Sequence, residues 1–336
     1  MSQSIQYVLV TGATGFIGAH VVDELLRRGL RVRGATRTLA KGHAMAAARP
    51  EHASSLDFVE IDDFERPGRL DIAVEGVDAV IHVASPLTYN TKNNEKELII
   101  PAINGVKGIL EASTKSGRVQ RVVLTSSFAA VLDATRKSPS YFTFTGKDWN
   151  PLTYEEAVAP TTPAHIAYRG AKKFSEKAAW DFVRDHQPGF DLVTICPSMT
   201  FGPVATPIDS ASQLNETNAM IWKVAKGLPL ARARVASWID VRDLAFAHVE
   251  ALLRPEAGGK RYIPCSPEPF SYDLAAQIME EEFGWARGKV QREDQPVDTS
   301  YGVDGETTAR ELGLSYTSFR KTIVDFVSQM TRVEDP

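Results

Sequence analysis

Tyr168 and Lys172 are the pair of residues in this sequence best suited to donate a proton. In a helix, residues four positions apart lie one turn from each other on the same face. A carbonyl group that accepts a hydride develops negative charge on its oxygen, so it needs a proton donor such as a phenol. An unperturbed tyrosine has a pKa near about 10, and an adjacent ammonium group lowers it by stabilising the phenolate. The pair therefore predicts reduction of a carbonyl with Tyr168 as proton donor, while Lys172 supplies the charge and can hydrogen-bond a nicotinamide ribose.

The segment Leu124-Thr125-Ser126-Ser127 adds hydroxyl groups to this candidate site. It ends an apolar run that is typical of a strand, and open α/β sheets bind ligands beyond the carboxyl ends of their strands. A serine in that place can hold a substrate carbonyl and stabilise its oxygen as negative charge develops. The residues alone leave Ser126 and Ser127 as alternatives for this role.

The segment from Thr11 to Gly18 reads Thr-Gly-Ala-Thr-Gly-Phe-Ile-Gly and joins an expected strand, 7–10, to an expected helix, 16–28. Glycines let the backbone turn sharply and approach a pyrophosphate, while free N–H groups at the helix start meet the anion. The spacing Gly-x-x-Gly-x-x-Gly differs from the Gly-x-Gly-x-x-Gly of dehydrogenases with a separate cofactor domain. We expect the pyrophosphate of a nicotinamide dinucleotide to bind here, at Gly12, Thr14, Gly15, Phe16, Ile17 and Gly18.

Arg37 follows the second expected strand, about 20 residues after the glycine turn, where NAD-binding proteins place an acidic residue on the ribose 2′-hydroxyl. A guanidinium group can instead form charge-assisted hydrogen bonds with a 2′-phosphate, with Arg33 or Lys41 as a further donor. The sequence therefore favours NADPH over NADH. Asp62 and Asp63 follow the third expected strand and are placed to meet the adenine edge.

Short apolar runs alternate with helical patterns through the first part of the chain. Strands that are apolar throughout and joined by helices indicate a parallel sheet covered on both faces. We expect an α/β fold, a doubly wound parallel sheet with a smaller C-terminal α/β substrate-binding region. The alternation breaks after Pro197, which places the dinucleotide-binding domain in 1–197 and 235–264 and the substrate-binding region in 198–234 and 265–332. The expected strands after the first are 31–35, 56–59, 79–83, 121–124 and 192–195.

The composition argues against several classes of partner. The formal net charge is −4 and like charges form no runs, which disfavours nucleic acid and anionic membranes. The N-terminus has no signal-like pattern, and no segment approaches the ~20 apolar residues of a membrane span. The two cysteines, Cys196 and Cys265, cannot build a disulfide framework, and no His, Cys and carboxylate cluster has metal-ligand spacing. We expect a cytoplasmic monomer or homodimer without metal, in which both thiols are buried.

Several residues that carry reactive groups have structural interpretations. His82 lies inside an apolar strand and is expected to be a core histidine rather than a base. Asp240 and Asp243 lie where a strand meets a helix, which suggests capping and first-turn interactions with the helix dipole. Thr162 and Pro163 are expected at the N-cap and first position of the helix that carries the Tyr168 motif.

Taken together, the motifs resemble those of the extended short-chain dehydrogenase/reductase superfamily. The resemblance rests on the glycine turn, on His82-Val-Ala-Ser-Pro86, on Leu124-Thr-Ser-Ser127 and on Tyr168-x-x-x-Lys172, and it covers nearly the whole chain. Within the superfamily, the sequence is similar to the dihydroflavonol reductase-like branch, which includes fungal methylglyoxal and carbonyl reductases. Trp149-Asn-Pro151 and Asp240-Val-Arg-Asp243 add to that similarity.

The resemblance implies a Ser-Tyr-Lys site that works with NADPH. Ser127 matches the family's carbonyl-binding position better than Ser126, which is kept as the alternative. The resemblance also implies that Ala84, Ser85, Pro197 and Ser198 line the cofactor. Thr125 is expected to contact the cofactor as well. By the same likeness, the substrate-facing residues are Leu87, Phe128 and Met199.

The leading hypothesis is therefore an NADPH-dependent reductase of aldehydes or ketones, including oxo-esters and dicarbonyls. A sugar-nucleotide epimerase or dehydratase that retains NAD is a second hypothesis, which Arg37 disfavours. A dinucleotide-binding protein without turnover is a third, and the complete Ser127, Tyr168 and Lys172 set disfavours it. The sequence leaves the identity of the carbonyl open.

Overall fold

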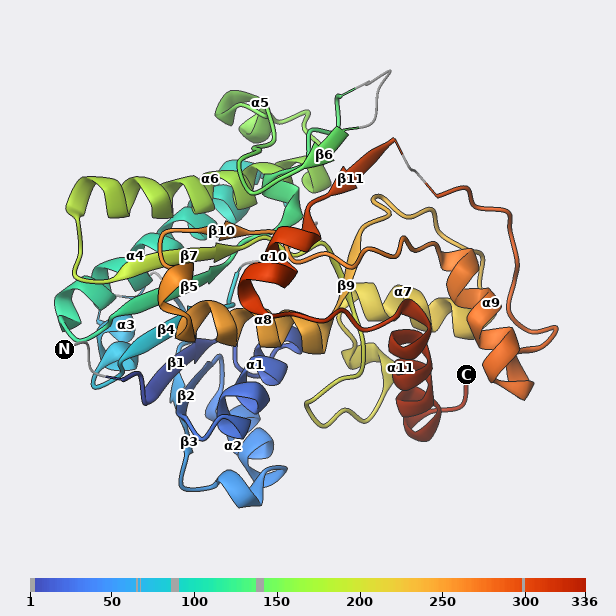
Figure 1. Ribbon diagram of the computed structural model, residues 1–336, viewed down its shortest axis with the longest axis horizontal. Helices are drawn as coiled ribbons and strands as arrows, with labels where there is room; N and C mark the ends of the chain where they lie inside the picture. Colours follow the sequence, from blue (N-terminus) through green and yellow to red (C-terminus); the bar gives the residue numbers. More distant parts are fainter. Residues whose placement is uncertain (1–3, 65, 67, 86–90, 137–141, 298–299) are drawn as a thin grey trace.

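A parallel sheet of seven strands, in the order β10-β7-β5-β4-β1-β2-β3, forms the centre of the protein (Figure 1). The structure is a computed structural model and describes residues 4–64, 66, 68–85, 91–136, 142–297 and 300–336. Every neighbouring pair in the sheet is parallel, and the strand order reverses between β1 and β4. The expected doubly wound α/β fold is confirmed. The strands are β1 (Tyr7–Thr11), β2 (Arg31–Thr36), β3 (Leu56–Glu60), β4 (Ala79–His82), β5 (Arg121–Thr125), β7 (Asp191–Ile195) and β10 (Arg261–Tyr262).

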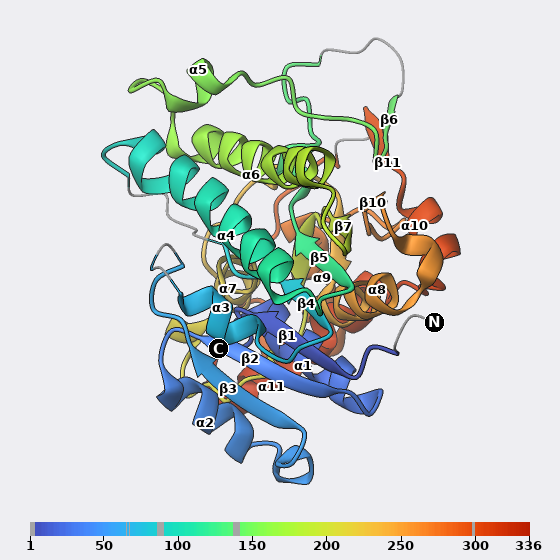
Figure 2. The same cartoon turned by 90° about the vertical axis from the view of Figure 1, so that its left-hand side faces the viewer.

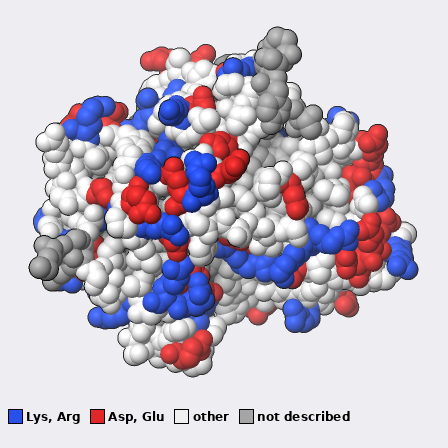
Figure 3. All heavy atoms as spheres, in the orientation of Figure 1, with Lys and Arg blue, Asp and Glu red and all other residues white. Residues whose placement is uncertain are grey.

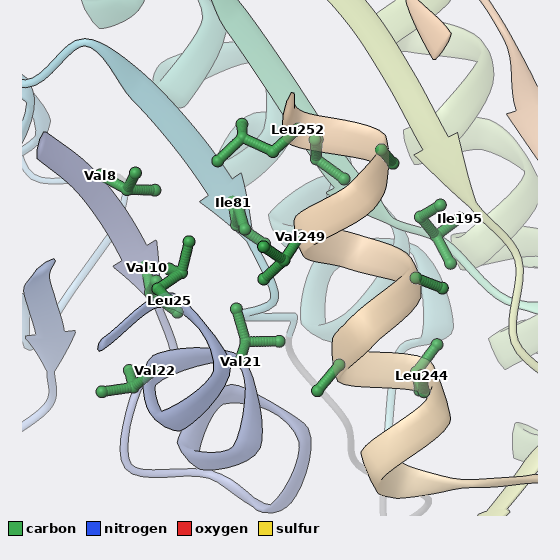
Figure 4. Packing of buried hydrophobic residues seen from close by; sticks show 14 of the residues in the cluster. Val8, Val10, Val21, Val22, Leu25, Ile81, Ile195, Leu244, Val249 and Leu252 are labelled. Atoms are coloured by element: carbon green, nitrogen blue, oxygen red, sulfur yellow. The ribbon is translucent and has the colours of Figure 1, made fainter. Parts of the chain in front are cut away.

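Helices cover both faces of this sheet, which is why its central strands are apolar on both sides. On one face, α1 packs against α8, and Figure 4 shows Val21 and Val249 of these helices beside Val10 and Ile81 of the strands. On the other face, α3, α4 and α6 lie together over the sheet (Figure 2). The bounds of the helices on the two faces are α1 (Phe16–Arg27), α8 (Val241–Leu253), α3 (Arg69–Val74), α4 (Ile100–Ser116) and α6 (Ala164–His186), with α2 (Leu39–Ala47) beside β3.

Helix α6 carries the Tyr168 motif and begins one residue later than the sequence suggests. Pro163 is its N-cap, with an extended ψ of 142°, and the first helical residue is Ala164. Thr162 does not cap the helix because its hydroxyl donates a hydrogen bond to the carbonyl oxygen of Glu156 at 2.6 Å. The expectation that Thr162 is the N-cap and Pro163 the first helical residue is therefore wrong by one position.

A second apolar core lies beside the sheet, where α7, α9 and α11 pack together (Figure 1). Its centre is a group of aromatic rings that includes Phe201, Trp238, Phe270 and Phe319. The chain enters and leaves this core between the last strands of the sheet, as the break after Pro197 suggests, while the exact domain division stays a prediction. The remaining elements are α5 (Tyr154–Val158), α7 (Glu216–Ala225), α9 (Tyr272–Glu282), α10 (Gly305–Leu312), α11 (Phe319–Val333) and the parallel pairs β6 (Phe142–Phe144) with β11 (Tyr301–Val303) and β8 (Met199–Phe201) with β9 (Trp238–Asp240).

Charged side chains of both signs lie close together on the face shown in Figure 3. Ion pairs between side chains of opposite sign are numerous in the described part of the chain, for example that of Arg292 with Asp273 at 2.8 Å. Within the described ranges, every helix is too short or too polar to cross a bilayer. Cys196 and Cys265 are free thiols and both are buried, as expected. Burial raises the pKa of each thiol to about 12, so neither is a reactive thiolate near neutral pH.

Candidate active site

A cavity of about 1140 Å³ opens beyond the carboxyl ends of β1, β4 and β5. This is the point where the strand order reverses, and open α/β sheets bind their ligands there. One end of the cavity is lined by the glycine turn after β1, and the other by α7, α9 and the segment before β9. Ser127, Tyr168 and Lys172 line it as well, so the structure brings the predicted catalytic residues and the glycine turn into one site.

The glycine turn is shaped by two close backbone approaches. Gly12 has a left-handed φ of 67°, and a Cβ there would lie 3.1 Å from the backbone nitrogen of Ala84. A Cβ on Gly18 would lie 2.1 Å from the carbonyl oxygen of Gly12, which only glycine allows. No side chain caps α1 at its Gly15 N-cap, so its first N–H groups remain for an anion. Such a cradle fits a dinucleotide pyrophosphate, and the six predicted contacts all line the cavity: Gly12, Thr14, Gly15, Phe16, Ile17 and Gly18.

Two cations lie at the β2 end of the cavity. Arg37 and Lys41 are exposed, line the cavity, and form no ion pair with a carboxylate in the described part of the chain. Arg33 is different, because its guanidinium group bonds Asp57 at 3.1 Å and the carbonyl oxygen of Glu75 at 2.8 Å, away from the cavity. The suggestion that Arg33 assists Arg37 is therefore wrong, since its side chain is used to join β2 to β3 and the end of α3.

The acidic pair at the end of β3 also lines the cavity. Asp62 lies 3.6 Å from Arg66 in an exposed ion pair. Asp63 lies beside it at the same edge. Their predicted contact with adenine stays a prediction, while their position at the end of the adjacent strand is compatible with it.

The residues after β4, β5 and β7 that are predicted to contact the cofactor line the same cavity. Nδ1 of His248 donates a hydrogen bond to the carbonyl oxygen of Leu244, so Nε2 of the neutral ring carries no proton. Nε2 therefore accepts a hydrogen bond from the hydroxyl of Thr125 at 2.7 Å. Burial lowers the pKa of His248 to about 4, which keeps the ring neutral. Ser198 is linked to the carbonyl oxygen of Ser237 at 2.6 Å. All five predicted cofactor contacts line the cavity: Ala84, Ser85, Thr125, Pro197 and Ser198.

The two adjacent serines have different partners. Ser126 donates a hydrogen bond to Oε2 of Glu176 at 2.6 Å and is buried. Ser127 accepts one from the backbone N–H of Ala129 at 3.1 Å, and no described group accepts its hydroxyl proton. Ser127 can therefore still donate to a ligand oxygen in the cavity, whereas the proton of Ser126 is already used.

Tyr168 and Lys172 lie one turn apart on α6, facing the cavity. Tyr168 is half-buried, and Lys172 is 8% exposed. Burial lowers the pKa of Lys172 to about 8, although the nearby Cys196 and Glu176 act in the opposite direction. The ammonium group is thus held in a site where its charge is costly, which strengthens its effect on any neighbouring phenol.

A buried ion pair supports this face of α6, and no sequence motif indicates it. Glu176 is fully buried and bonds Arg261 of β10 at 2.7 Å. It also accepts hydrogen bonds from Ser126 and Thr194. Burial disfavours its charge, but the Arg261 guanidinium and these hydrogen bonds outweigh that effect and lower the pKa of Glu176. The network fixes α6 against β5, β7 and β10, directly behind the catalytic candidates.

Asn150 joins the Ser127 turn to the Tyr168 helix. Its side-chain nitrogen donates to the carbonyl oxygens of Ala129 at 2.7 Å and Arg169 at 3.2 Å. Its backbone N–H donates to the carbonyl oxygen of Ala130 at 2.9 Å. These bonds hold Ser127 and Tyr168 in a fixed relation, so Asn150 is a positioning residue that the motif analysis used only as a family marker.

The substrate end of the cavity contains more residues than the sequence identified. Met199 lines it, and Phe128 lines it while its ring packs edge-on against Phe144. Leu87 lies outside the described residues. The additional lining residues are His165, Arg169, Asn215, Glu216, Thr217, Met220, Ala231, Arg232, Arg234, Val235 and Tyr272. The sequence shows basic residues directly after Tyr168, at Arg169, and in the Arg-Ala-Arg of 232–234. Only the tertiary structure brings them to one cavity.

His82, Asp240 and Asp243 have the structural roles that the sequence predicts. His82 is buried, its Nδ1 lies 2.9 Å from the hydroxyl of Thr11, and burial lowers its pKa to about 3. Asp240 caps α8 by accepting from the N–H of Arg242 at 2.8 Å. Asp243, in the first turn of α8, accepts from the N–H of Thr317 at 2.6 Å. The interpretations of His82, Asp240 and Asp243 are confirmed.

Several proteins to which this chain is similar are named as reductases. The chain is 33% identical to the ketoreductase azaE of Aspergillus niger, over 98% of this chain and 99% of that protein. It is 32% identical to the NADPH-dependent methylglyoxal reductase GRE2 of Saccharomyces cerevisiae, over 97% and 98%. The crystal structure of yeast methylglyoxal/isovaleraldehyde reductase complexed with NADPH superimposes with a TM-score of 0.89 at 30% identity, covering 97% of this chain and 98% of that one.

The family assignment rests on a match over most of the sequence. The model of the NAD dependent epimerase/dehydratase family matches residues 8–263, which include the glycine turn, the Ser127 turn and the Tyr168 helix. The same residues line one cavity at the switch point of the sheet. The chain therefore belongs to the NAD dependent epimerase/dehydratase family, as an extended short-chain dehydrogenase/reductase related to the fungal methylglyoxal reductases.

Proposed function

We propose that this protein reduces aldehydes and ketones, including oxo-esters and dicarbonyls, to alcohols with NADPH. The observation that carries the proposal is the single cavity that joins the glycine turn and Arg37 to Ser127, Tyr168 and Lys172. The printed functions of the relatives, a ketoreductase and an NADPH-dependent methylglyoxal reductase, support the same reaction. Arg37 and Lys41 supply the positive charge that a 2′-phosphate needs.

The chain's own residues account for the proton in this reaction. Bound NADPH supplies the hydride that reaches the carbonyl carbon. Ser127 donates a hydrogen bond to the carbonyl oxygen and orients it, and Tyr168 donates the proton as negative charge develops there. The Lys172 ammonium, held in a buried place, favours release of that proton from Tyr168. Asn150 keeps the Ser127 turn and α6 in register for the transfer.

Neither alternative explains the site as well. An epimerase or dehydratase that retains NAD has no use for Arg37 and Lys41 beside the adenosine ribose. A dinucleotide-binding protein without turnover has no need for Ser127, Tyr168 and Lys172 in one cavity. Release of tightly bound NAD on denaturing the purified protein would favour the first alternative over the reductase.

We also propose the organisation of the enzyme. Residues 198–234 and 265–332 form the substrate-binding region, because α7, α9 and the 231–235 segment line the far end of the cavity. The enzyme acts in the cytoplasm, where both cysteines stay reduced, as a monomer or homodimer. Its partners are the cofactor and a small carbonyl compound.

The test is replacement of the proposed proton donor. Tyr168→Phe should lower kcat for carbonyl-dependent NADPH oxidation by about 100-fold or more, because general acid catalysis contributes about 10²–10⁴. NADPH binding, measured by fluorescence, should be retained. Tyr7→Phe is the matched control, since Tyr7 bonds Asp57 at the opposite end of β1 and should leave activity unchanged. Unchanged turnover in Tyr168→Phe would show that another group donates the proton.

A further inference from the structure

Basic side chains gather at the substrate end of the cavity. His165 and Arg169 lie one turn apart on α6, on the same side as Tyr168. Arg232 and Arg234 come from the segment between α7 and β9 and line the same cavity. Two separate parts of the chain thus bring positive charge to the region next to the proposed proton donor.

His165, Arg169 and Arg234 line one cavity, and the charge of Arg234 lowers the pKa of the other two. Burial lowers the pKa of Arg169, and the charge of Arg234 is the next contribution. Burial also lowers the pKa of His165, followed by the charges of Arg234 and Arg169. Like charges that interact in this way repel each other, and an anion placed between them would relieve that repulsion.

Among the described residues, few carboxylates lie near these groups. Glu216, the first residue of α7, is the one carboxylate among the described residues that line this end, beside the guanidinium groups of Arg169 and Arg232. The other lining carboxylates are the pair at the end of β3 and Glu176, which Arg261 holds. Arg169 and Arg232 form no ion pair with any carboxylate of the described chain.

Resting on the proposed reductase function, we propose that the preferred substrate is a carbonyl compound that carries a carboxylate, an oxo acid. Its carboxylate binds the guanidinium group of Arg169, within the positive field of Arg232 and Arg234, while its carbonyl oxygen meets Ser127 and Tyr168. A planar guanidinium group suits this role because it donates two parallel hydrogen bonds to a carboxylate. Arg169 directly follows Tyr168, so recognition of the anion and donation of the proton come from one turn of α6.

The experiment compares oxo acids with their methyl esters, which keep the carbonyl and lose the charge. Pairs of 2-oxo, 4-oxo and 5-oxo acids and their esters are assayed with NADPH at low and high salt. For at least one chain length, kcat/KM should be about tenfold or more higher for the acid, and this preference should shrink as salt rises. Equal rates for acid and ester at every length would overturn the proposal.

Substitutions of Arg169 test whether this residue causes the preference for the acid. Arg169→Gln should lower kcat/KM for the acid at least about tenfold more than for the ester, mainly through KM, and Arg169→Lys should recover part of the loss. Arg184→Gln is the matched control, because Arg184 lies on the same helix, is exposed, and pairs with Asp181 away from the cavity. NADPH binding and the unfolding temperature verify that each variant is folded. Equal losses on acid and ester would also overturn the proposal.

The reaction with neutral carbonyl compounds separates the carboxylate proposal from the reductase function. If the protein reduces neutral ketones and aldehydes but shows no preference for the acids, only the carboxylate proposal is wrong. If it oxidises no NADPH with any carbonyl, neutral or acidic, the reductase function is wrong and the substrate proposal fails with it.

Discussion

Arg37 and Lys41 are the cations at the β2 end of the cavity, and neither is used in a described ion pair. Arg37→Ala should lower kcat/KM for NADPH by about 10- to 100-fold, because a hydrogen bond to a charged group contributes about 1.5–3 kcal/mol. The value for NADH should change by less than about threefold, since it has no 2′-phosphate. Arg31→Ala is the control, because Arg31 lies at the start of β2, at the end opposite to Arg37, and its guanidinium group stacks on the Tyr7 ring. If the ratio of kcat/KM for NADPH to that for NADH did not change, Arg37 would not contribute to the choice of cofactor.

Lys172 makes the activity depend on pH. Its pKa is lowered to about 8 by burial, so its charge is complete below that pH and is lost as pH rises through it. The kcat/KM profile should therefore fall above about pH 8, because an uncharged amine no longer favours proton release from Tyr168. Lys172→Arg, whose charge persists at high pH, should lower activity overall but flatten the profile between about pH 8 and 9.5. A wild-type profile that is flat through this range would contradict the assigned role.

At the level of elements, α1 can begin next to the glycine turn only because Gly18 has no Cβ atom. Gly18→Ala would place a Cβ 2.1 Å from the carbonyl oxygen of Gly12, so α1 must move away from the turn. Overpacking of this kind costs about 1–3 kcal/mol, and the N–H groups at the helix start would no longer meet the pyrophosphate. We expect a lower unfolding temperature and weaker NADPH binding by calorimetry. Gly189→Ala is the control, because a Cβ there meets nothing within 4 Å, and wild-type binding in Gly18→Ala would refute the argument.

Local patterns identified the elements that carry the cofactor half of the site. The strands β1, β4 and β5 are largely apolar runs, a pattern that is typical of buried parallel strands. The start of α6 could not be predicted to the residue, because Thr162 bonds Glu156 instead of capping the helix. Capping depends on which partner the tertiary structure offers, and a sequence pattern does not contain that information.

The substrate half of the site was less predictable for the same reason. Arg169 and Arg234 are 65 positions apart and come together only because α6 and the segment before β9 line one cavity. Glu176 and Arg261 are 85 positions apart, and a lone glutamate on a helix is usually solvated. Motifs report residues that act within one element, whereas these pairs depend on the packing of several.

At the level of the whole molecule, Glu176 and Arg261 hold α6 to the edge of the sheet. Glu176→Gln would leave the Arg261 guanidinium buried without its counter-charge, which typically costs about 3–5 kcal/mol. Urea unfolding at pH 7 should show this loss, while Asp181→Asn, an exposed position on the same helix, should change stability by less than about 0.5 kcal/mol.

The sign of the pH effect follows from the pKa of Glu176, which is lowered in the folded protein. Its contribution is present above the ordinary pKa of a glutamate and is lost as pH falls through the lowered value. The stability difference between wild type and Glu176→Gln should therefore narrow in acid. A difference that is absent at pH 7, or constant through the acid range, would exclude this role for the pair.

The second core is not an appendage at one end of the chain. The chain leaves the sheet after β7 for α7, returns in α8 and β10, and leaves again for α9 and α11. Because the polypeptide is interlaced in this way, no single cut separates a cofactor-binding fragment from a substrate-binding one. The substrate specificity of a related enzyme therefore cannot be transferred to this protein by exchanging one continuous segment of the chain. A change of preferred carbonyl compound therefore requires changes in several separate segments of the chain that line the cavity.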